Sequence, residues 1–201
     1  MKTTSAKVEV QKLINLRSQY GRVSMDIVQL VARSILFILP SYFANSIPVV
    51  LGGGAPLDAK RNLFGNRLFG DGKTLRGFAA GIAAGLLVGA LEGIFLPGSA
   101  WDIYSGSAAA YAFAGLLLGA GTMVGDLAGS FIKRRQGVAQ GKPSWIMDQL
   151  MFLFFAFLCS YPIASHLLSV ESVLFLAGLT YVVHIGANVL AHRWGLKKVP
   201  W

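Results

Sequence analysis

Five long apolar runs, separated by short polar segments, dominate the chain. They cover residues 27–51, 77–96, 108–128, 145–168 and 172–191. About 20 consecutive apolar residues form a helix long enough to cross the hydrocarbon core of a bilayer. The pattern therefore predicts an all-α integral membrane protein, a single domain built as a bundle of five transmembrane helices.

The first 25 residues form a polar and basic segment that precedes the first apolar run. Val10, Leu13 and Ile14 recur at helical spacing, so that apolar side chains gather on one face. A helix with one apolar and one basic face lies in the plane of the membrane surface. We therefore expect residues 1–25 to form an amphipathic N-terminal segment on the membrane.

Glycine occupies every fourth position of the second apolar run. The stripe consists of Gly77, Gly81, Gly85, Gly89 and Gly93. Small residues at this spacing allow a neighbouring transmembrane helix to approach closely. The stripe predicts a packing surface and carries no chemistry.

The composition supports a membrane protein with an anionic partner. The chain is 54% hydrophobic and 13% charged, with a formal net charge of +9, and its mean hydropathy is +0.58. Its basic residues flank the apolar runs and do not line one soluble face, which favours lipid head groups or a phosphorylated substrate over nucleic acid. The single cysteine, Cys159, excludes an intrachain disulfide.

The distribution of Lys and Arg predicts the orientation in the membrane. They concentrate in residues 52–76, in residues 129–144 and in the C-terminal tail. Cytoplasmic segments of membrane proteins are enriched in these residues. We therefore expect residues 52–76 and 129–144 to be cytoplasmic loops, with the C-terminus cytoplasmic and the N-terminus outside. Five basic residues among the first 25 argue for the opposite orientation.

Two aspartates lie at the ends of neighbouring apolar runs. Asp126 is near the end of the third run and Asp148 near the start of the fourth, so an antiparallel helix pair would bring both to one membrane face. Mg²⁺ is commonly held by one or two carboxylates together with substrate phosphates. The alternative is that each aspartate pairs with a neighbouring Lys or Arg, and spacing alone does not separate the two interpretations.

The first basic loop contains Gly72-Lys73-Thr74, which is reminiscent of a nucleotide-binding P-loop. A P-loop needs glycine five residues before Gly72, where this chain has Arg67. A glycine-rich turn at a helix N-terminus still suits a phosphate, because free N–H groups and the helix dipole attract anions. Lys73 and Arg76 add positive charge there.

A polar stripe interrupts the last apolar run. Thr180, His184, Asn188 and His192 recur at every fourth position. Polar side chains inside a membrane generally face the bundle interior or a wet cavity. The stripe therefore either lines a substrate site or makes hydrogen bonds between helices.

The segment around the two aspartates resembles the signature of the CDP-diacylglycerol synthase family, a family of membrane cytidylyltransferases. In that signature S-x-x-K-R is followed by a glycine and by an aspartate near the start of the next helix. The matching residues here are Gly125-Asp126, Ser130-Phe131-Ile132-Lys133-Arg134, Gly137 and Asp148. Lys73-Thr74 followed by Gly77 resembles the family's K-T-x-E-G, with Arg76 where glutamate is usual.

Three further features resemble the archaeal branch of the family, the CDP-archaeol synthases. They are Pro56-x-Asp58, the run from Gly70 to Gly77, and the pair Asp148-Gln149. The resemblance covers roughly residues 56–152.

The chain departs from the family pattern near the second aspartate. Residues 142–145 read Lys-Pro-Ser-Trp where the bacterial enzymes have a histidine and glycines. Met151 stands where another acidic residue is usual, and Asn66 where the archaeal pattern commonly has aspartate. The resemblance therefore implies one Mg²⁺ shared by Asp126 and Asp148 in preference to two metal ions.

The resemblance implies that CTP and a polyprenyl glycerol phosphate lipid, unsaturated archaetidic acid, give a CDP-lipid and pyrophosphate. The attacking group is a phosphate monoester with a second pKa of about 6, so the reaction needs no general base. Catalysis then consists of positioning and electrostatic stabilisation.

The resemblance also implies roles for individual residues. Asp126 and Asp148 would bind Mg²⁺, and Lys133 and Arg134 the triphosphate. Looser candidates for substrate binding are Asn62, Arg67, Lys73, Thr74, Ser130, Lys142, His184 and Asn188, with Asn62 assigned to the ribose or base.

Two alternative functions fit the sequence less well. A CDP-alcohol phosphotransferase requires D-x-x-D-G-x-x-A-R, which this sequence lacks. A small membrane transporter for a phosphorylated organic anion would use the same basic cavity, but transporters often contain inverted repeats, and the chain shows no such internal symmetry. The sequence leaves open the oligomeric state, the lipid tail specificity and the residues that recognise cytosine.

Overall fold

The computed structural model describes residues 2–140, 142, 144, 147–196 and 198–199, with side chains from residue 26 onward except at 147 and 149. Its elements in chain order are α1 (Lys2–Leu51), β1 (Asn62–Leu63), β2 (Asn66–Arg67), α2 (Leu75–Phe95), α3 (Ala108–Arg135), α4 (Met147–Ala164), a 3₁₀ turn η1 (Ser165–Leu167) and α5 (Val170–Arg193). The two short strands pair antiparallel as a hairpin.

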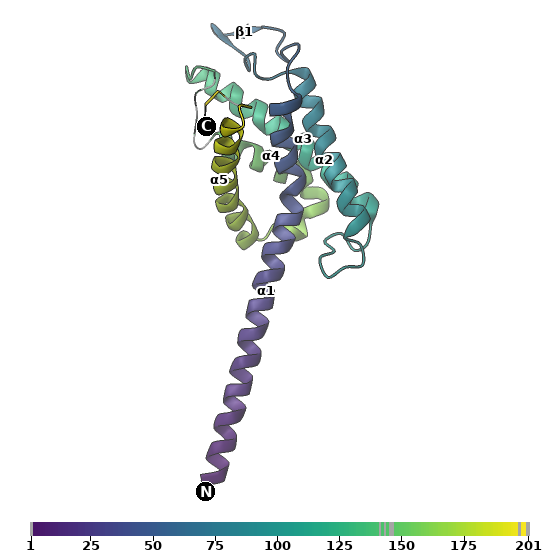
Figure 1. Cartoon of the computed structure of the whole chain (residues 1–201), viewed down its shortest axis with the longest axis vertical. Helices are drawn as coiled ribbons and strands as arrows, with labels where there is room; N and C mark the ends of the chain where they lie inside the picture. Colours follow the sequence, from purple (N-terminus) through teal and green to yellow (C-terminus); the bar gives the residue numbers. More distant parts are fainter. Residues whose placement is uncertain (1, 141, 143, 145–146, 197, 200–201) are drawn as a thin grey trace.

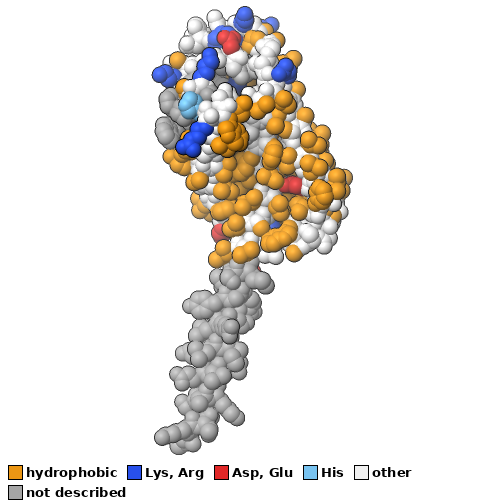
Figure 2. Space-filling view, in the orientation of Figure 1, with side chains coloured by type: hydrophobic (Ala, Val, Ile, Leu, Met, Phe, Trp, Pro, Cys, Tyr) orange, Lys and Arg blue, Asp and Glu red, His pale blue; other side chains and the backbone are white. Residues whose placement is uncertain are grey.

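Five helices in the described part of the chain are long and apolar enough to cross a membrane. Their outward faces carry exposed apolar side chains, such as Phe154, Leu174 and Val182. Figure 2 shows hydrophobic side chains over much of the visible face of the bundle. Exposed apolar residues at this density suit a hydrocarbon environment. The prediction of an all-α membrane bundle is confirmed.

Helix α1 runs without a break from Lys2 to Leu51. The N-terminal segment is therefore continuous with the first span, whereas we expected a boundary near residue 26. Figure 1 shows this part of α1 extending beyond the body of the bundle, away from the end that carries β1. Its position on the membrane surface stays a prediction.

Helix α3 lies at the centre of the bundle, packed closely against α2 on one side and α4 on the other. A Cβ atom added at Gly85 would come within 2.7 Å of the Gly115 oxygen and the Gly119 Cα. A Cβ atom added at Gly125 would come within 2.6 Å of the Phe152 Cα in α4. The close approach of α2 and α3 confirms the packing role predicted for the glycine stripe.

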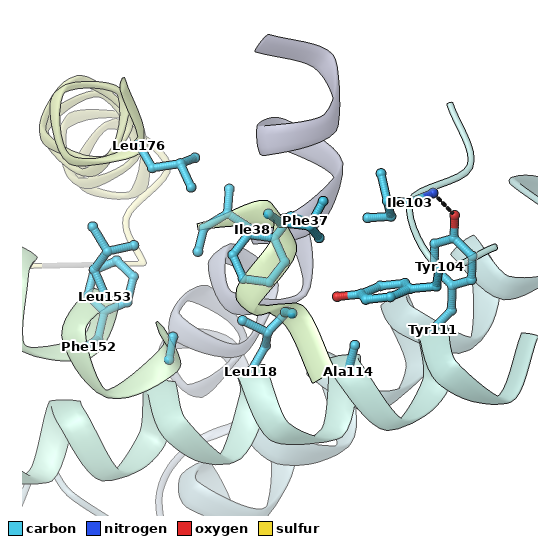
Figure 3. Close-up of a cluster of buried hydrophobic side chains, with 13 residues drawn as sticks. Phe37, Ile38, Ile103, Tyr104, Tyr111, Ala114, Leu118, Phe152, Leu153 and Leu176 are labelled. Atoms are coloured by element: carbon cyan, nitrogen blue, oxygen red, sulfur yellow. Dashed lines mark hydrogen bonds between the residues drawn. The ribbon is translucent and has the colours of Figure 1, made fainter. Parts of the chain in front are cut away.

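The buried apolar core joins α1, α3, α4 and α5. Phe37, Leu118, Phe152 and Leu176 are almost fully buried and face one another across the bundle, as Figure 3 shows. Tyr111 is also buried, and its hydroxyl accepts a hydrogen bond from the Ile103 N–H at 2.7 Å. This core fixes the helices beneath the basic end of the molecule.

The basic segments gather at one end of the bundle. The end of α1, the hairpin, the start of α2, the end of α3 and the end of α5 all lie there (Figure 1), and the Lys and Arg side chains in Figure 2 concentrate at this end. The two basic loops therefore share one face, as predicted.

The predicted loop 129–144 begins later than expected, because α3 continues to Arg135. Ser130, Lys133 and Arg134 therefore lie on the last two turns of a helix. Cations stabilise a helix C-terminus through the helix dipole. After the end of α3, the first residue with positive φ is Gly137, at 70°. The predicted start of the fourth span at residue 145 lies outside the described residues.

Candidate active site

A lysine from the first basic loop contacts the aspartate of α3. Lys73 Nζ lies 2.6 Å from both carboxylate oxygens of Asp126. The Lys73 side chain is 29% exposed and that of Asp126 is 32% exposed, so the pair is open to a ligand from the basic end. Asp126 lies about two and a half turns before the end of α3 at Arg135, so the cation beside it is supplied by Lys73 and the helix dipole adds little there.

A second ion pair joins α3 to the start of α4. Lys133 Nζ donates to Asp148 Oδ1. The other carboxylate oxygen of Asp148 accepts from the Ser144 N–H at 2.9 Å. Asp148 is in the first turn of α4, where the positive end of the helix dipole stabilises a carboxylate.

The packing of α3 on α4 places the two aspartates at the same level of the bundle. Gly121 approaches Phe155 and Ala156, and Gly125 approaches Met151 and Phe152. Continuing this antiparallel register sets Asp148 opposite Gly129, three residues beyond Asp126. Three residues correspond to about 4.5 Å along a helix, so both aspartates lie at the same end of the bundle, as expected for an antiparallel helix pair.

The donor set suits one magnesium ion held together with phosphates. Asp126 and Asp148 supply carboxylate oxygens, the ligands that Mg²⁺ prefers. Within the described residues no group of three or more His, Cys, Asp or Glu side chains could hold a metal ion. In this structure each carboxylate is paired with a lysine, which was the alternative interpretation of the sequence.

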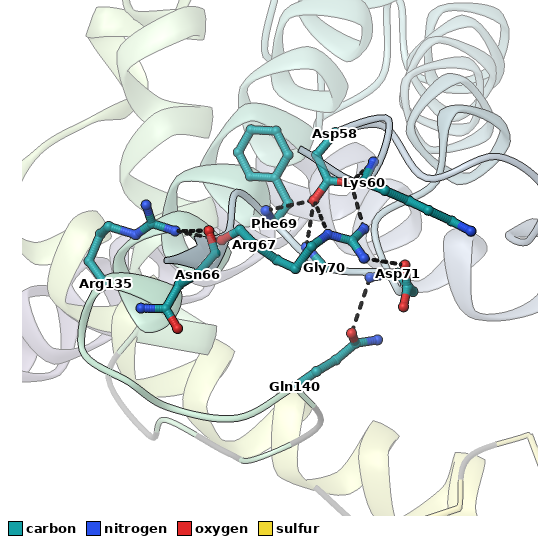
Figure 4. A network of polar contacts seen from close by, with 9 residues as sticks. All are labelled: Asp58, Lys60, Asn66, Arg67, Phe69, Gly70, Asp71, Arg135 and Gln140. Carbon is teal, nitrogen blue, oxygen red and sulfur yellow. Dashed lines mark hydrogen bonds and ion pairs between the residues drawn. The ribbon is translucent and has the colours of Figure 1, made fainter. Parts of the chain in front are cut away.

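Asp58 organises the first basic loop, a role that the sequence did not reveal. Its side chain is fully buried and accepts hydrogen bonds from the backbone N–H groups of Lys60, Phe69 and Gly70 at 3.0 to 3.1 Å. It also accepts from Arg67 Nη2 at 2.7 Å and Nε at 3.2 Å (Figure 4). The Arg67 guanidinium, assisted by the backbone N–H groups, holds the pKa of Asp58 well below its usual range.

Arg67, predicted to bind phosphate, is used within its own loop. Its guanidinium contacts Asp58 and also Asp71, at 2.8 Å. Both carboxylates raise the pKa of Arg67. Asn62 pairs with Arg67 in the hairpin and is exposed, and its predicted contact with the ribose or base stays a prediction.

Thr74 caps helix α2. Its hydroxyl oxygen accepts from the Gly77 N–H at 3.1 Å and from the Gly53 N–H at 3.2 Å. The residue is buried, so its principal role here is to start α2 immediately after Lys73 and to tie α2 to the segment that follows α1. A phosphate contact by Thr74 stays a prediction.

The end of α3 and the second basic loop hold the first loop in place. Arg135 donates to the carbonyl oxygens of Leu63, Asn66 and Arg67 at 2.5 to 3.0 Å. Gln140 accepts from the Asp71 N–H at 3.1 Å, as Figure 4 shows. The two basic loops therefore form one connected surface.

The remaining candidates in this region differ in exposure. Ser130 and Arg134 are buried, and Arg134 Nη2 donates to the Ala139 carbonyl oxygen at 3.4 Å. Lys142 is exposed. Their predicted contacts with substrate phosphates stay predictions.

The polar stripe of α5 contributes to helix packing through Thr180. The buried Thr180 hydroxyl lies 2.9 Å from the Tyr42 hydroxyl of α1. His184 and Asn188 are half-buried further along α5, toward the basic end. Their role in lining a substrate site stays a prediction.

Known proteins match this chain over most of its length. A family model described as CarS-like, CDP-archaeol synthase, matches residues 27–201. CDP-archaeol synthase of Methanococcus aeolicus is 42% identical over 180 residues, covering 88% of this chain and all of that protein. CDP-archaeol synthase of Pyrococcus abyssi is 47% identical over 166 residues, covering 82% of this chain and 95% of that protein.

A solved structure, described as that of an intramembrane enzyme for archaeal membrane lipids biosynthesis, has the same fold. It is 35% identical, covers 77% of this chain and 92% of its own, and superimposes with a TM-score of 0.61. The chain therefore belongs to the CDP-archaeol synthase family, membrane enzymes that activate archaeal lipids as CDP derivatives.

Proposed function

We propose that this protein transfers the cytidylyl group of CTP to the phosphate of unsaturated archaetidic acid. A phosphate oxygen of the lipid attacks the α-phosphorus of CTP, and the bond to the β-phosphate breaks. The products are the CDP-lipid and pyrophosphate. The observation that supports this most directly is the convergence of two lysine–aspartate pairs at the basic end of a membrane bundle.

The proposed reaction does not require a protein side chain to remove a proton from the attacking group. A phosphate monoester with a second pKa of about 6 is largely deprotonated at neutral pH. The main obstacle is the repulsion between two anions and the charge that develops on pyrophosphate. Fixed cations aimed at the phosphates lower both costs, and Lys73 and Lys133 are held where they can supply that charge.

We assign a single Mg²⁺ to Asp126 and Asp148. When bound, the ion would neutralise phosphate charge and stabilise the leaving pyrophosphate. The lysines that neutralise these carboxylates in the structure would then be available to the triphosphate. Lys133 would make the principal contact and Arg134 would add positive charge from the adjacent position of α3. Metal and nucleotide binding would therefore support each other.

The basic end of the bundle is assigned to the cytoplasm. Lys and Arg gather at this end, and cytoplasmic segments are enriched in these residues. CTP is a cytoplasmic nucleotide, so this orientation brings the substrate to the carboxylates. The N-terminus would lie on the opposite side.

The test is product formation by the purified protein with unsaturated archaetidic acid, Mg²⁺ and CTP labelled at either the α- or the γ-phosphate. We expect α-label in the lipid fraction and γ-label in pyrophosphate. Asp148→Asn should abolish both signals, whereas Glu171→Gln, an exposed acid at the opposite end of the bundle, should retain them. Nucleotide binding by the wild-type protein without lipid labelling would contradict the proposal and favour an anion transporter.

A further inference from the structure

We infer that Asp58 is a positioning residue that aims Lys73 at Asp126. This inference rests on the proposed function, in which Lys73 serves the nucleotide phosphates. The Asp58 side chain is fully buried. Its hydrogen bonds come from Arg67 and from backbone N–H groups of the same loop. Its effect on the reaction would pass through the backbone.

The hydrogen bonds of Asp58 converge on the end of the loop that carries Lys73. Asp58 Oδ2 accepts the N–H groups of both Phe69 and Gly70 at 3.1 Å. A buried carboxylate that accepts several hydrogen bonds is strongly held, because losing any one leaves a charged group unsatisfied. These contacts fix the backbone where the chain turns from β2 toward α2.

A short chain of backbone contacts links this anchor to Lys73. The Gly70 carbonyl accepts the Lys73 N–H at 3.1 Å, and the Lys73 carbonyl accepts the Leu57 N–H at 2.7 Å. Gly70 has a φ of 100°, a conformation that glycine adopts readily. Lys73 is thus held through both of its backbone polar groups, next to the residues that Asp58 fixes.

The tip of the hairpin has a separate anchor. Arg135 binds the carbonyl oxygens of Leu63, Asn66 and Arg67. The hairpin therefore stays attached to α3 without Asp58, and the distinct contribution of Asp58 is the turn at residues 69–73. A variant at Asp58 should disturb Lys73 more than it disturbs the rest of the site.

The activity test is a double-mutant cycle with Asp58→Asn and Lys73→Ala. Misplacing a catalytic contact by about 1 Å can cost roughly 100-fold, so we expect Asp58→Asn alone to lower kcat/KM by roughly 10- to 100-fold. In the Lys73→Ala background it should have little further effect, because residues that act through one another are not additive. The control is Asp71→Asn, which removes the exposed second partner of Arg67 and should leave kcat/KM within about twofold.

A second readout does not depend on activity. Reductive methylation of the folded protein, followed by mass spectrometry, reports the reactivity of each lysine amine. We expect Lys73 to react severalfold faster in Asp58→Asn than in wild type, while Lys133, whose side chain is 12% exposed on a different element, keeps its rate. Asp58→Glu, which retains the charge, should give an intermediate rate and supplies the test if Asp58→Asn does not fold.

The possible results distinguish failure of the proposed function from failure of the positioning role of Asp58. A wild-type protein that makes no CDP-lipid contradicts the proposed function, and the methylation pattern still tests the position of Lys73. An active wild type with additive effects of the two substitutions, or with an unchanged Lys73 rate, overturns the inference. An equal increase at Lys73 and Lys133 also overturns it, because that result indicates general loosening of the protein.

Discussion

At the scale of single residues, the charged side chains of the candidate site form two lysine–aspartate ion pairs. Lys73 holds Asp126 and Lys133 holds Asp148. An isolated charge at a membrane interface is costly, so each partner lowers the cost of keeping the other in place. In the proposed function, a nucleotide with its metal ion would replace both sets of contacts, the metal binding the aspartates and the phosphates binding the lysines.

The placement of Asp126 and Asp148 at one end of the bundle could be predicted, because charged residues at the ends of two neighbouring apolar runs are easily recognised in the sequence. Asp58 could not be predicted in the same way, since its partners are backbone N–H groups at Lys60, Phe69 and Gly70. Those positions share no periodic pattern in the sequence. The contact of Arg135 with the hairpin could not be predicted either, because Arg135 binds backbone carbonyl oxygens, which every residue has.

The depressed pKa of Asp58 predicts a pH-dependent stability. The fold favours the ionised carboxylate, so its contribution is fully present above the unfolded-state pKa, about 3.9, and is lost as the pH falls further toward the lower folded-state pKa. At pH 7, Asp58→Asn should cost about 1.5 to 3 kcal/mol, the range for one hydrogen bond to a charged group. Thermal unfolding in detergent measures this difference.

Below pH 4 the stability difference between wild type and Asp58→Asn should shrink, because asparagine does not titrate. The exposed Asp71 provides the comparison, since Asp71→Asn should show a much smaller difference at every pH. A difference for Asp58→Asn that stays constant from pH 7 to pH 3 would show that the charge of Asp58 does not contribute to stability.

At the scale of secondary-structure elements, α3 is the frame on which the site is built. It contributes Asp126, Lys133 and Arg135 and packs closely on both neighbouring helices. The glycine stripe of α2 could be predicted because its four-residue repeat is regular. The residue at which α3 ends could not be predicted, because Lys133, Arg134 and Arg135 are as typical of a cytoplasmic loop as of a helix C-terminus.

Gly85→Ala tests the close packing of α2 on α3. An added Cβ would lie 2.7 Å from backbone atoms of Gly115 and Gly119, so the helices would have to separate. We expect destabilisation by about 1 to 3 kcal/mol, typical of overpacking, and reduced activity. Thermal unfolding and the CDP-lipid assay measure both effects.

Gly178→Ala is the matched control on α5. A Cβ there meets nothing within 4 Å, so the higher helix propensity of alanine should leave stability unchanged or raise it by up to about 1 kcal/mol. Equal destabilisation by the two substitutions would show that the effect comes from the loss of glycine itself and not from contact between α2 and α3.

At the scale of the whole molecule, the fold separates a basic end from an apolar body. The five spans and the gathering of the basic loops followed from hydropathy and charge, because the bilayer dictates helix length and backbone pairing. The continuity of α1 from Lys2 to Leu51 did not follow, because a change from polar to apolar composition does not require a break in the helix.

The orientation can be tested by labelling introduced thiols in intact cells after replacing Cys159 by serine. Suitable substitutions are Ala100→Cys and Gln136→Cys. Ala100 is in the loop between α2 and α3, Gln136 follows α3 at the basic end, and both residues are exposed. A membrane-impermeant maleimide should label the thiol introduced at residue 100 in intact cells and the one at residue 136 only after lysis. The reverse pattern would place the basic end outside.

The central claim is that Asp126 and Asp148 act together on one metal-bound nucleotide. Calorimetric titration of CTP into the purified protein, with and without Mg²⁺, tests it most directly. We predict that Mg²⁺ strengthens CTP binding to wild type, that Asp126→Asn and Asp148→Asn each remove this effect, and that the double variant is no weaker than either single variant. A Mg²⁺-dependent gain in affinity that survives in either single variant would contradict the account.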